Sequence, residues 1–412
     1  MAQRYGPRIV TDSLVLCLDA HDAKSYAGEP TTNVVTYTDL NIGWSKGYQS
    51  NIAYNEIDPP AGITSQVVGH TRGNNSGYWY SYGDYAPQVP NTVYTVSMYV
   101  KTLDSNFKIN FYTADNSETG RFWSSHISVP NDGEWHRVVW DSFTNPSNSQ
   151  SDSLSFNFTY GGAINETSTR TWFCAPQMEA KSYATPFVAG SRSATNGWVD
   201  RSGNSNHGTL VNGTDTGVSH YRDGQVIMPV ANSYLDFDGS NDYISIPQFD
   251  FTSTHSLEWW FNTDNLTEKY TGGYAGHMLC WGHSPSERIQ LRTNGGIRIY
   301  IHDSSTGASF DTSNFNVTAG EWTHITATLD WVNKSVKFYQ NGVLKDTISF
   351  SSLGSWNYTG ASNPYDYIDF GRNVNNNNIF FDGKLASIKI YNKVLTAAEV
   401  LSNYNATKGR FS

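Results

Sequence analysis

Short segments in which apolar and polar residues alternate, separated by clusters of Gly, Asn, Asp and Pro, recur along this chain from Val10 almost to its end. A period of two puts the apolar side chains on one face of a strand, so each segment is expected to bury one face. Clear examples lie at residues 92–101, 154–160, 321–330 and 335–340. Many short strands joined by polar turns predict an all-β protein built from β-sandwiches.

Only the C-terminus carries a helix signal. Thr396 can cap a helix, and Glu399, three residues later, completes a capping box. We therefore expect one short helix over residues 396–405. The composition agrees, because 14% of the residues are aromatic and only 16% are charged, whereas long helices need more Ala, Glu, Lys and Leu.

The chain is acidic, with 27 basic residues, 37 acidic residues and a formal net charge of −10. No run of Lys or Arg offers a basic face to phosphate groups, so nucleic acid is not an expected partner. No window approaches the roughly 20 apolar residues of a membrane span, and the first residues lack the apolar core of a signal peptide. We expect no membrane insertion and no secretion signal.

The three cysteines, Cys17, Cys174 and Cys280, lie far apart and form no C-x-x-C pair. Neither a zinc ribbon nor a disulfide framework is therefore indicated. Buried free thiols are the expected role.

A weak internal repeat suggests two sandwiches. TVSMYVKT at 95–102 is echoed by SLEWWFNT at 256–263, and a Gly-Glu-Trp turn precedes an alternating strand in both halves. We expect the rings of Trp135 and Trp322 in these turns to fill the space between two sheets. The spacing between the paired segments differs in the two copies, so they are two sandwich types with similar core strands.

The longer half of the chain carries a family resemblance. WVDRSGNSNHGTLVNG at 198–213, YLDFDGSNDYISIP at 234–247 and FDGKLASIKIYNKVLTAAEVLSNYN at 381–405 resemble the laminin-G-like, concanavalin A-like sandwich found in phage structural proteins. Residues 9–26 look like the opening strand of the same domain type. In the family that strand normally runs on to the D-x-SGN-x-N-x-G element, but here a long stretch with its own strands intervenes.

The intervening stretch has its own resemblance. TNVVTYTDLNIGWSKGYQSN at 32–51 and WFCAPQMEAKSYATPFVAGSR at 172–192 are similar to the first and last segments of carbohydrate-binding-module-like jelly rolls attached to phage tail proteins. The resemblances imply that residues 1–30 and 193–412 form one laminin-G-like sandwich and that residues 31–192 form a jelly roll inserted into it. Insertion is physically reasonable in a surface loop whose ends lie close together.

Two aromatic segments are candidate sugar-binding sites, because a flat ring can cover the CH face of a sugar while Asn, Asp and Gln bond its hydroxyls. The candidate ligand-binding residues are Tyr78, Trp79, Tyr80 and Tyr82 in the first segment and Trp356, Tyr358 and Tyr365 in the second. The first segment also fits a strand with Tyr78, Tyr80 and Tyr82 on one face and Trp79 on the other. Packing and a subunit interface stay open as alternatives for both.

One segment offers oxygen ligands for a metal. Asp236, Asp238, Asn241 and Asp242 lie within seven residues, and calcium accepts such ligands. Asp-Gly-x-Asn-Asp is also ordinary hairpin-turn chemistry, which is the favoured interpretation. Calcium is the one cofactor that the sequence raises.

No catalytic pattern occurs in its required context: Gly43-Trp44-Ser45-Lys46-Gly47 matches the G-x-S-x-G nucleophile elbow, but no helical period follows it. The sequence contains no E-x-D-x-E triplet of the kind that concanavalin A-like glycosidases use, and no H-E-x-x-H zinc motif. His136 and His324, beside the repeated tryptophans, are interpreted as structural histidines. We expect a protein that is not an enzyme, although a glycoside hydrolase with catalytic residues on separate strands stays open.

These resemblances imply a bacteriophage virion surface protein, such as a tail fibre, appendage or capsid decoration, that binds glycans for host-cell attachment. It would be made in the host bacterial cytoplasm and released by lysis. Its expected partners are other virion proteins, host surface polysaccharide and further copies of itself in a homo-oligomer. The alternative is a purely structural decoration or assembly protein that binds other virion subunits.

Overall fold

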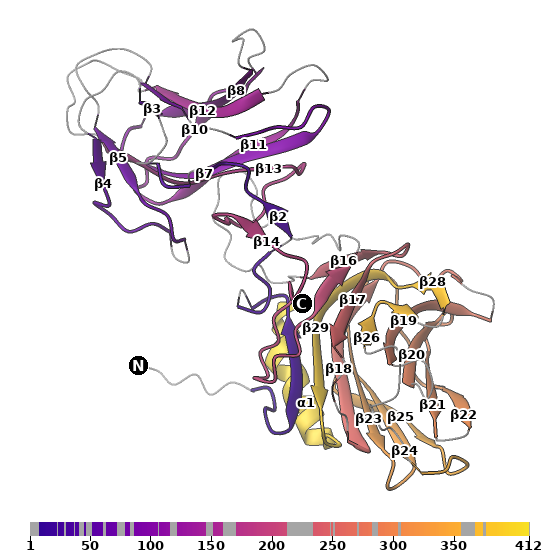
Figure 1. Ribbon diagram of the computed structural model, residues 1–412. Helices are drawn as coiled ribbons and strands as arrows, with labels where there is room; N and C mark the ends of the chain where they lie inside the picture. Colours follow the sequence, from indigo (N-terminus) through magenta and orange to yellow (C-terminus); the bar gives the residue numbers. More distant parts are fainter. Residues whose placement is uncertain are drawn as a thin grey trace, which may run out of the picture. The chain divides into compact units, whose positions relative to one another are not determined.

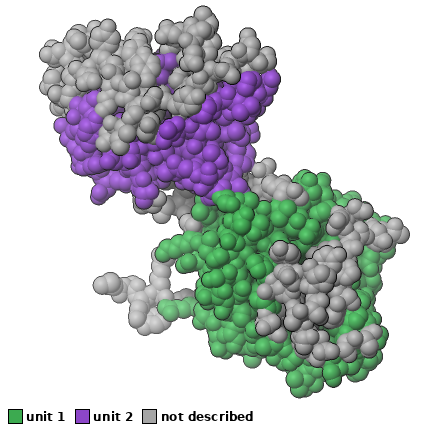
Figure 2. All heavy atoms as spheres, in the orientation of Figure 1, with its two compact units in different colours: residues 1–29, 193–218, 229–412 green, residues 30–192, 219–228 purple. Residues whose placement is uncertain are grey.

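A computed structural model of the chain divides into two compact units, which are Met1–Glu29, Ser193–Val218 and Pro229–Ser412 (unit 1) and Pro30–Arg192 and Ser219–Met228 (unit 2) (Figure 2). The structure describes residues 8–22, 24–28, 30–36, 38–40, 45–46, 52–60, 63–71, 79–82, 86–105, 107–115, 122–145, 151–159, 170–211, 234–247, 249, 252–269, 272–281, 287–303, 306–355, 367–373 and 376–411.

Unit 1 contains two seven-stranded antiparallel sheets (Figure 1). Sheet 1 has the order β1-β29-β18-β23-β24-β25, with β16 also paired to β29. Its strands are β1 (Leu14–Asp19), β16 (Leu235–Asp238), β18 (Thr254–Thr263), β23 (Thr323–Asp330), β24 (Ser335–Gln340), β25 (Val343–Ser349) and β29 (Asp382–Tyr391). The opening strand of the chain thus pairs with one of its last.

Sheet 2 has the order β15-β17-β26-β19-β20-β21-β22. Its strands are β15 (Thr209–Val211), β17 (Tyr243–Pro247), β26 (Tyr367–Phe370), β19 (Tyr274–Trp281), β20 (Glu287–Arg292), β21 (Ile297–His302) and β22 (Gly307–Asp311). A short pair, β27 (Arg372–Asn373) and β28 (Asn376–Phe380), completes the strands of unit 1.

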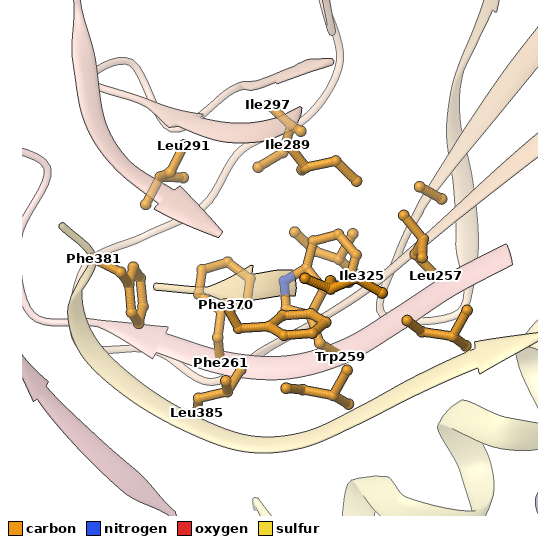
Figure 3. Close-up of a cluster of buried hydrophobic side chains, with 14 of the residues drawn as sticks. Leu257, Trp259, Phe261, Ile289, Leu291, Ile297, Ile325, Phe370, Phe381 and Leu385 are labelled. Atoms are coloured by element: carbon orange, nitrogen blue, oxygen red, sulfur yellow. The ribbon is translucent and has the colours of Figure 1, made fainter. Parts of the chain in front are cut away.

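The two sheets enclose one apolar core. Trp259 and Phe261 of sheet 1 belong to the same buried cluster as Ile289, Leu291 and Ile297 of sheet 2, and Figure 3 shows these side chains pointing toward one another. Burial of this surface at roughly 25 cal/mol per Å² is the main stabilising term. Alternation leaves the other face of each sheet free to carry polar side chains.

The D-x-SGN-x-N-x-G segment at 200–208 fastens β1. The buried carboxylate of Asp200 accepts hydrogen bonds from the backbone N–H groups of Cys17 and Ser202, both at 2.8 Å. Ser202 Oγ and Asn206 Nδ2 donate to the carbonyl oxygen of Val15, at 3.0 and 2.9 Å. This polar turn therefore satisfies backbone groups of β1 that have no partner on the side away from β29.

Helix α1 (Ala397–Thr407) and a 3₁₀ turn (Lys408–Arg410) follow β29. The predicted capping box is confirmed, since Thr396 Oγ1 accepts from the backbone N–H of Glu399 and the Glu399 carboxylate accepts from that of Thr396. The helix covers the outer face of sheet 1, where Asn403 Nδ2 donates to Glu258 Oε2 at 2.7 Å. None of the described helices is long and apolar enough to cross a membrane.

Unit 2 contains a second pair of sheets. Sheet 3 has the order β11-β7-β13-β5-β4, with β4 (Ile52–Tyr54), β5 (Val68–Thr71), β7 (Val93–Thr102), β11 (His136–Thr144) and β13 (Arg170–Glu179). Sheet 4 has the order β10-β8-β12-β6-β3 with β9 beside β8, and comprises β3 (Ser45–Lys46), β6 (Trp79–Tyr82), β8 (Lys108–Asp115), β9 (Phe122–Trp123), β10 (Ile127–Ser128) and β12 (Ser151–Thr159). The small pair is β2 (Thr31–Thr32) and β14 (Ser191–Arg192).

The predicted fold class is confirmed: the chain is all-β, built as sandwiches, with one short C-terminal helix. Cys17 and Cys174 are buried free thiols, as expected. Burial raises the pKa of Cys17 to about 11. The side chain of Cys280 lies outside the described residues.

The prediction for the two Gly-Glu-Trp turns is wrong. Trp135 lies on the outer face of sheet 3, where its indole N–H donates to the carbonyl of Asp58 at 3.1 Å. Trp322 lies on the outer face of sheet 1, with its ring centroid 4.7 Å from that of Phe411. The reason is parity: Ile325 of β23 points into the core, so Trp322, three residues earlier, points to the opposite face. The buried core of unit 1 instead contains Trp198, Trp259 and Trp331.

Candidate functional site

The predicted sugar-binding aromatics fall largely outside the described structure. Tyr78, Trp356, Tyr358 and Tyr365 lie outside the described residues. Trp79, Tyr80 and Tyr82 belong to β6, so the strand alternative is confirmed for their backbone, while their side chains lie outside the described part. The side chains of all seven predicted ligand-binding residues therefore lie outside the described part of the structure.

Strand β6 nevertheless lies beside a row of polar residues on sheet 4. Tyr80 pairs with Asn157 and Tyr82 with Ser155 in the register of β6 and β12. Across the next strand, Asn157 and Ser155 pair with Asn110 and Tyr112 of β8. Phe156 and Phe158 enter the core, so these polar residues occupy the outer face.

Two polar atoms on this face are buried without a hydrogen-bond partner. They are Ser155 Oγ and Asn157 Oδ1, on residues that are 0% and 4% exposed. A buried polar atom ordinarily has a partner, which here would be ordered water or the hydroxyl of a ligand.

The predicted calcium segment forms a turn between β16 and β17. Asp238 Oδ1 accepts from the backbone N–H of Ser240 at 2.7 Å, and Asp242 Oδ2 accepts from that of Asp238 at 3.0 Å. Both carboxylates thus serve the turn itself. Asp236 and Asn241 make further interactions. Within the described part of the chain, no group of three or more His, Cys, Asp or Glu side chains is arranged to hold a metal ion, and calcium binding stays a prediction.

The outer face of sheet 2 carries a regular grid of polar and aromatic side chains. In β20, Ile289 and Leu291 point into the core, which leaves Arg288, Gln290 and Arg292 on the opposite face. In β21, the core residues are Ile297, Ile299 and Ile301, and the outer residues are Arg298, Tyr300 and His302. The grid follows directly from the period of two in both strands.

A tight turn sets the register of this hairpin. Asn294 Oδ1 accepts from the backbone N–H of Gly296 at 3.0 Å, and Gly295 adopts a φ of 78°. A Cβ at Gly295 would lie 2.5 Å from the carbonyl oxygen of Val317, so only glycine fits. The turn aligns Arg288 with Tyr300 and Gln290 with Arg298.

One row of residues crosses six strands of sheet 2. Ser245 of β17 pairs with Asp369 of β26, and strand β19 lies between β26 and β20. Arg288 of β20 pairs with Tyr300 of β21, which in turn pairs with Ser309 of β22. We call Ser245, Asp369, Arg288, Tyr300 and Ser309 the polar row. At about 4.8 Å per strand the row extends over about 24 Å.

Arginine and tyrosine side chains stack on this face. The guanidinium of Arg288 lies 4.6 Å from the Tyr300 ring centroid, that of Arg292 lies 4.6 Å from Tyr274, and that of Arg372 lies 3.6 Å from Tyr243. Such stacks hold both partners in place by cation–π attraction.

The ring of Tyr300 also lies close to strand β22. A Cβ at Gly307 would collide with the phenol of Tyr300, so that ring lies over the neighbouring strand β22. The ring is therefore held flat along the sheet.

Three of the arginines are paired with carboxylates, and the longest of these contacts joins Arg292 Nε to Asp311 Oδ1 at 3.8 Å. Arg298 Nε and Nη2 donate to Asp311 at 2.7 and 2.5 Å, and Arg298 holds the pKa of that carboxyl below its ordinary value. Arg372 Nε donates to Asp369 Oδ2 at 2.6 Å. Burial raises the pKa of Asp369, against the opposing effect of Arg372.

The two carboxylates described on this face are too far apart to act as a glycosidase pair. Asp369 is in β26 and Asp311 is in β22, four strands away, which places them about 19 Å apart. Glycosidases need carboxyl groups roughly 5 to 9.5 Å apart. Asp369 and Asp311 therefore do not form a glycosidase pair.

Sequence reasoning missed this face, although its signal was present. ERIQLRTNGGIRIYIH at 287–302 alternates strictly on both sides of an Asn-Gly-Gly turn, which is a hairpin pattern. The residues opposite the isoleucines are Arg, Gln, Tyr and His. Such a set on one face of a hairpin could have been proposed as a binding surface.

The two histidines interpreted as structural have local partners. His136 Nε2 lies 2.8 Å from Asp132 Oδ1. His324 is fully buried, with its Nε2 atom 3.4 Å from Glu258 Oε1. Neither lies on the grid of sheet 2.

Comparisons with solved structures give fold-level similarity only. Domain 4 of an extracellular arabinanase from Geobacillus stearothermophilus, in complex with arabinotriose, is 23% identical over 50% of this chain and 91% of that one, with a TM-score of 0.35. The binding domain of Paraclostridial mosquitocidal protein 1 is 19% identical over 52% of this chain and 50% of that one, with a TM-score of 0.39. The botulinum neurotoxin serotype D binding domain is 15% identical over 52% and 49%, with a TM-score of 0.37.

The chain thus spans about half the length of the toxin binding domains that it matches. A search of curated proteins found no match. A scan against protein families matched residues 238–401, which include most of both sheets of unit 1. In these residues the chain is similar to the laminin-G family described as the concanavalin A-like lectin/glucanases superfamily.

Proposed function

We propose that this protein binds glycans without catalysis, at the surface of a bacteriophage particle, and so attaches it to the host cell. The observation that carries the proposal is the outer face of sheet 2, where Arg288 of β20 and Tyr300 of β21 stand side by side over an apolar core. Flat rings with fixed guanidinium donors suit sugar recognition.

Two further observations support the proposal. Residues 238–401 match a family whose description names lectins. The segments at 9–26 and 381–405 resemble those of phage structural proteins, which is the ground for the virion assignment. The polar face of sheet 4 in unit 2 would supply a second sugar contact.

A glycan array and binding to whole bacterial cells test the function. The intact protein should bind envelope glycans, and Tyr300→Ala should weaken binding by about two- to tenfold, the usual range for one aromatic contact. Tyr54→Ala, at an exposed tyrosine of β4 in unit 2, is the matched control and should bind as the parent does. If no glycan and no cell is bound, the proposal is wrong.

Assembly is a second candidate function, favoured by one apolar patch in unit 1. Val343 and Leu344 of edge strand β25 are 56% and 46% exposed, and Leu401 of α1 is 45% exposed. Leu401 Cδ1 lies 3.2 Å from the position of a Cβ on Gly342, so Leu401 lies close to the start of β25. Exposed apolar residues at a sheet edge suit a protein partner.

Sedimentation velocity tests this second function. The parent protein should form an oligomer or bind other virion subunits, and Leu401→Asp should lower the association constant. Exposed Ser352→Asp, beyond the end of β25, introduces the same charge away from Val343 and Leu344 and is the control. Identical sedimentation of the parent and Leu401→Asp as monomers, with no binding to virion subunits, would exclude this role for the patch.

A further inference from the structure

Unit 2 has an apolar core of its own. Among the residues that the structure describes, the clusters of unit 2 draw only on residues from Val34 to Phe187, and the large cluster of unit 1 contains none of these. The main segment of unit 2 begins at Pro30 and ends at Arg192. A unit with a separate core can lose its structure separately when both of its ends are fixed within it.

The two ends of this segment pair with each other inside unit 2. Strands β2 and β14 are antiparallel, which places Thr31 opposite Arg192. Next to them, the backbone N–H of Asn33 donates to the carbonyl oxygen of Gly190 at 2.8 Å. A pair of two-residue strands is too short to be stable by itself, so it needs support from the rest of unit 2.

That support is a buried carboxylate, Glu179, which ends β13 and is 0% exposed. Its Oε2 atom accepts hydrogen bonds from Thr31 Oγ1 at 2.8 Å and Thr185 Oγ1 at 2.7 Å. Its Oε1 atom accepts from the backbone N–H of Thr185 and from Gln177 Nε2, both at 2.7 Å. Arg192 Nη2 donates to Thr185 Oγ1 at 2.9 Å. Both ends of the segment therefore reach one cluster, whose donors replace the water that the carboxylate loses on burial.

A bulge in β13 aims the carboxylate at these ends. The register of β13 against β7 shifts after Cys174, and such bulges redirect the side chains that follow. Asn33 contacts the bulge, because its Nδ2 donates to the carbonyl oxygen of Pro176 at 3.1 Å and its Oδ1 accepts from the backbone N–H of Met178 at 3.0 Å. Met178 then enters the core, which leaves Glu179 on the opposite face.

We propose that Glu179 and the four groups that donate to it form a latch, which closes the two ends of unit 2 and lets unit 2 open as one cooperative unit while unit 1 stays folded. Loss of the carboxylate leaves buried donors without an acceptor, and all of these donors belong to unit 2. Opening of the latch involves no glycan, so it is measured independently of what the protein binds.

Hydrogen exchange of the intact protein, followed by mass spectrometry on peptides from both units, measures the opening of each unit. Glu179→Ala should accelerate exchange of the protected amides of β7 and β13 by about a hundredfold, because at least two charge-assisted hydrogen bonds are lost at about tenfold each. The amides of β18 and β23 in unit 1 should change by less than about threefold.

Milder variants separate the parts of the latch. Thr31→Val removes only the contact to the first end and should accelerate exchange in unit 2 by about tenfold. Glu179→Gln should lose less than Glu179→Ala, because it keeps the shape and the hydroxyl groups of Thr31 and Thr185 can turn to accept from its amide. Glu134→Ala, at an exposed carboxylate of unit 2, is the matched control and should exchange as the parent does.

Equal acceleration of β7 and β18 in Glu179→Ala would overturn the proposal, because the two units would then open together. Acceleration confined to β2 and β14 would also overturn it, since the ends would then fray without opening the unit, as would unchanged exchange throughout unit 2. If Glu179→Ala does not fold, the exchange of Thr31→Val decides by the same criteria.

Discussion

At the scale of single residues, the least expected feature is a buried ion pair beneath helix α1. Lys389 Nζ donates to Glu258 Oε1 at 2.8 Å, and neither residue is more than 1% exposed. Asn403 of the helix donates to the other carboxylate oxygen at 2.7 Å. The charges compensate one another, so removal of one partner leaves the other buried and unpaired.

Lys389→Met should therefore lower the free energy of unfolding by about 3 to 5 kcal/mol, the usual cost of breaking a buried pair. Urea denaturation followed by tryptophan fluorescence measures it. Lys337→Met, on an exposed face of the same sheet, should change stability by less than about 0.5 kcal/mol. An equal loss of unfolding free energy in the two variants would show that the buried Glu258 carboxylate is not stabilised by Lys389.

The same pair predicts a dependence of stability on pH. Burial alone would raise the pKa of Glu258, but Lys389 and His324 outweigh it and lower that pKa from 4.5 to about 2. A lowered folded-state pKa contributes stability above pH 4.5 that is lost as the pH falls toward 2.

The melting temperature should therefore drop over that interval, and Glu258→Gln should flatten the drop because it removes the titrating group. Circular dichroism melts at several pH values measure this. An equal pH slope in the variant would contradict the assignment of the effect to Glu258.

At the scale of elements, the turn at 200–208 is predicted to hold the opening strand in sheet 1. Asp200 accepts hydrogen bonds from Cys17, Ser202 and Asn206. Asp200→Ala removes a buried acceptor shared by several donors, so it should cost more than about 3 kcal/mol, since each charge-assisted bond contributes about 1.5 to 3.

Hydrogen exchange of the β1 amides should increase in Asp200→Ala, and that of β23 should change less. Asp132→Ala, at an exposed carboxylate of unit 2, is the control for loss of one negative charge. Unchanged protection of β1 would show that pairing with β29 holds the strand without the turn.

The sequence predicted elements well where the information is local. Residues 335–340 were expected as a strand and form β24, and the capping box at Thr396 begins α1. The outward position of Trp322 also depends on local information, because it stands three residues before the core residue Ile325 along an extended strand.

What the sequence could not predict depends on pairing between distant strands. Lys389 meets Glu258 across 131 positions of the chain. The polar row joins strands from β17 to β26, whose order in sheet 2 differs from their order in the chain. Local periodicity tells which face a residue occupies, and only the sheet topology tells which residues share a row.

At the scale of the whole molecule, the chain carries two compact units, each with its own core and its own polar sheet face. We propose that residues 31–192, which make up most of unit 2, are a carbohydrate-binding-module-like jelly roll inserted into a laminin-G-like sandwich. Two binding faces on one chain would raise the avidity for a repetitive polysaccharide if both can engage it.

The central claim is that the outer face of sheet 2 binds glycan. A crystal structure of the intact protein with a bound oligosaccharide from a host-envelope polysaccharide tests it most directly. The account predicts sugar on this face, in contact with Arg288 or the hydroxyl edge of Tyr300. Sugar bound only elsewhere on the chain, with this face unaltered, would contradict it.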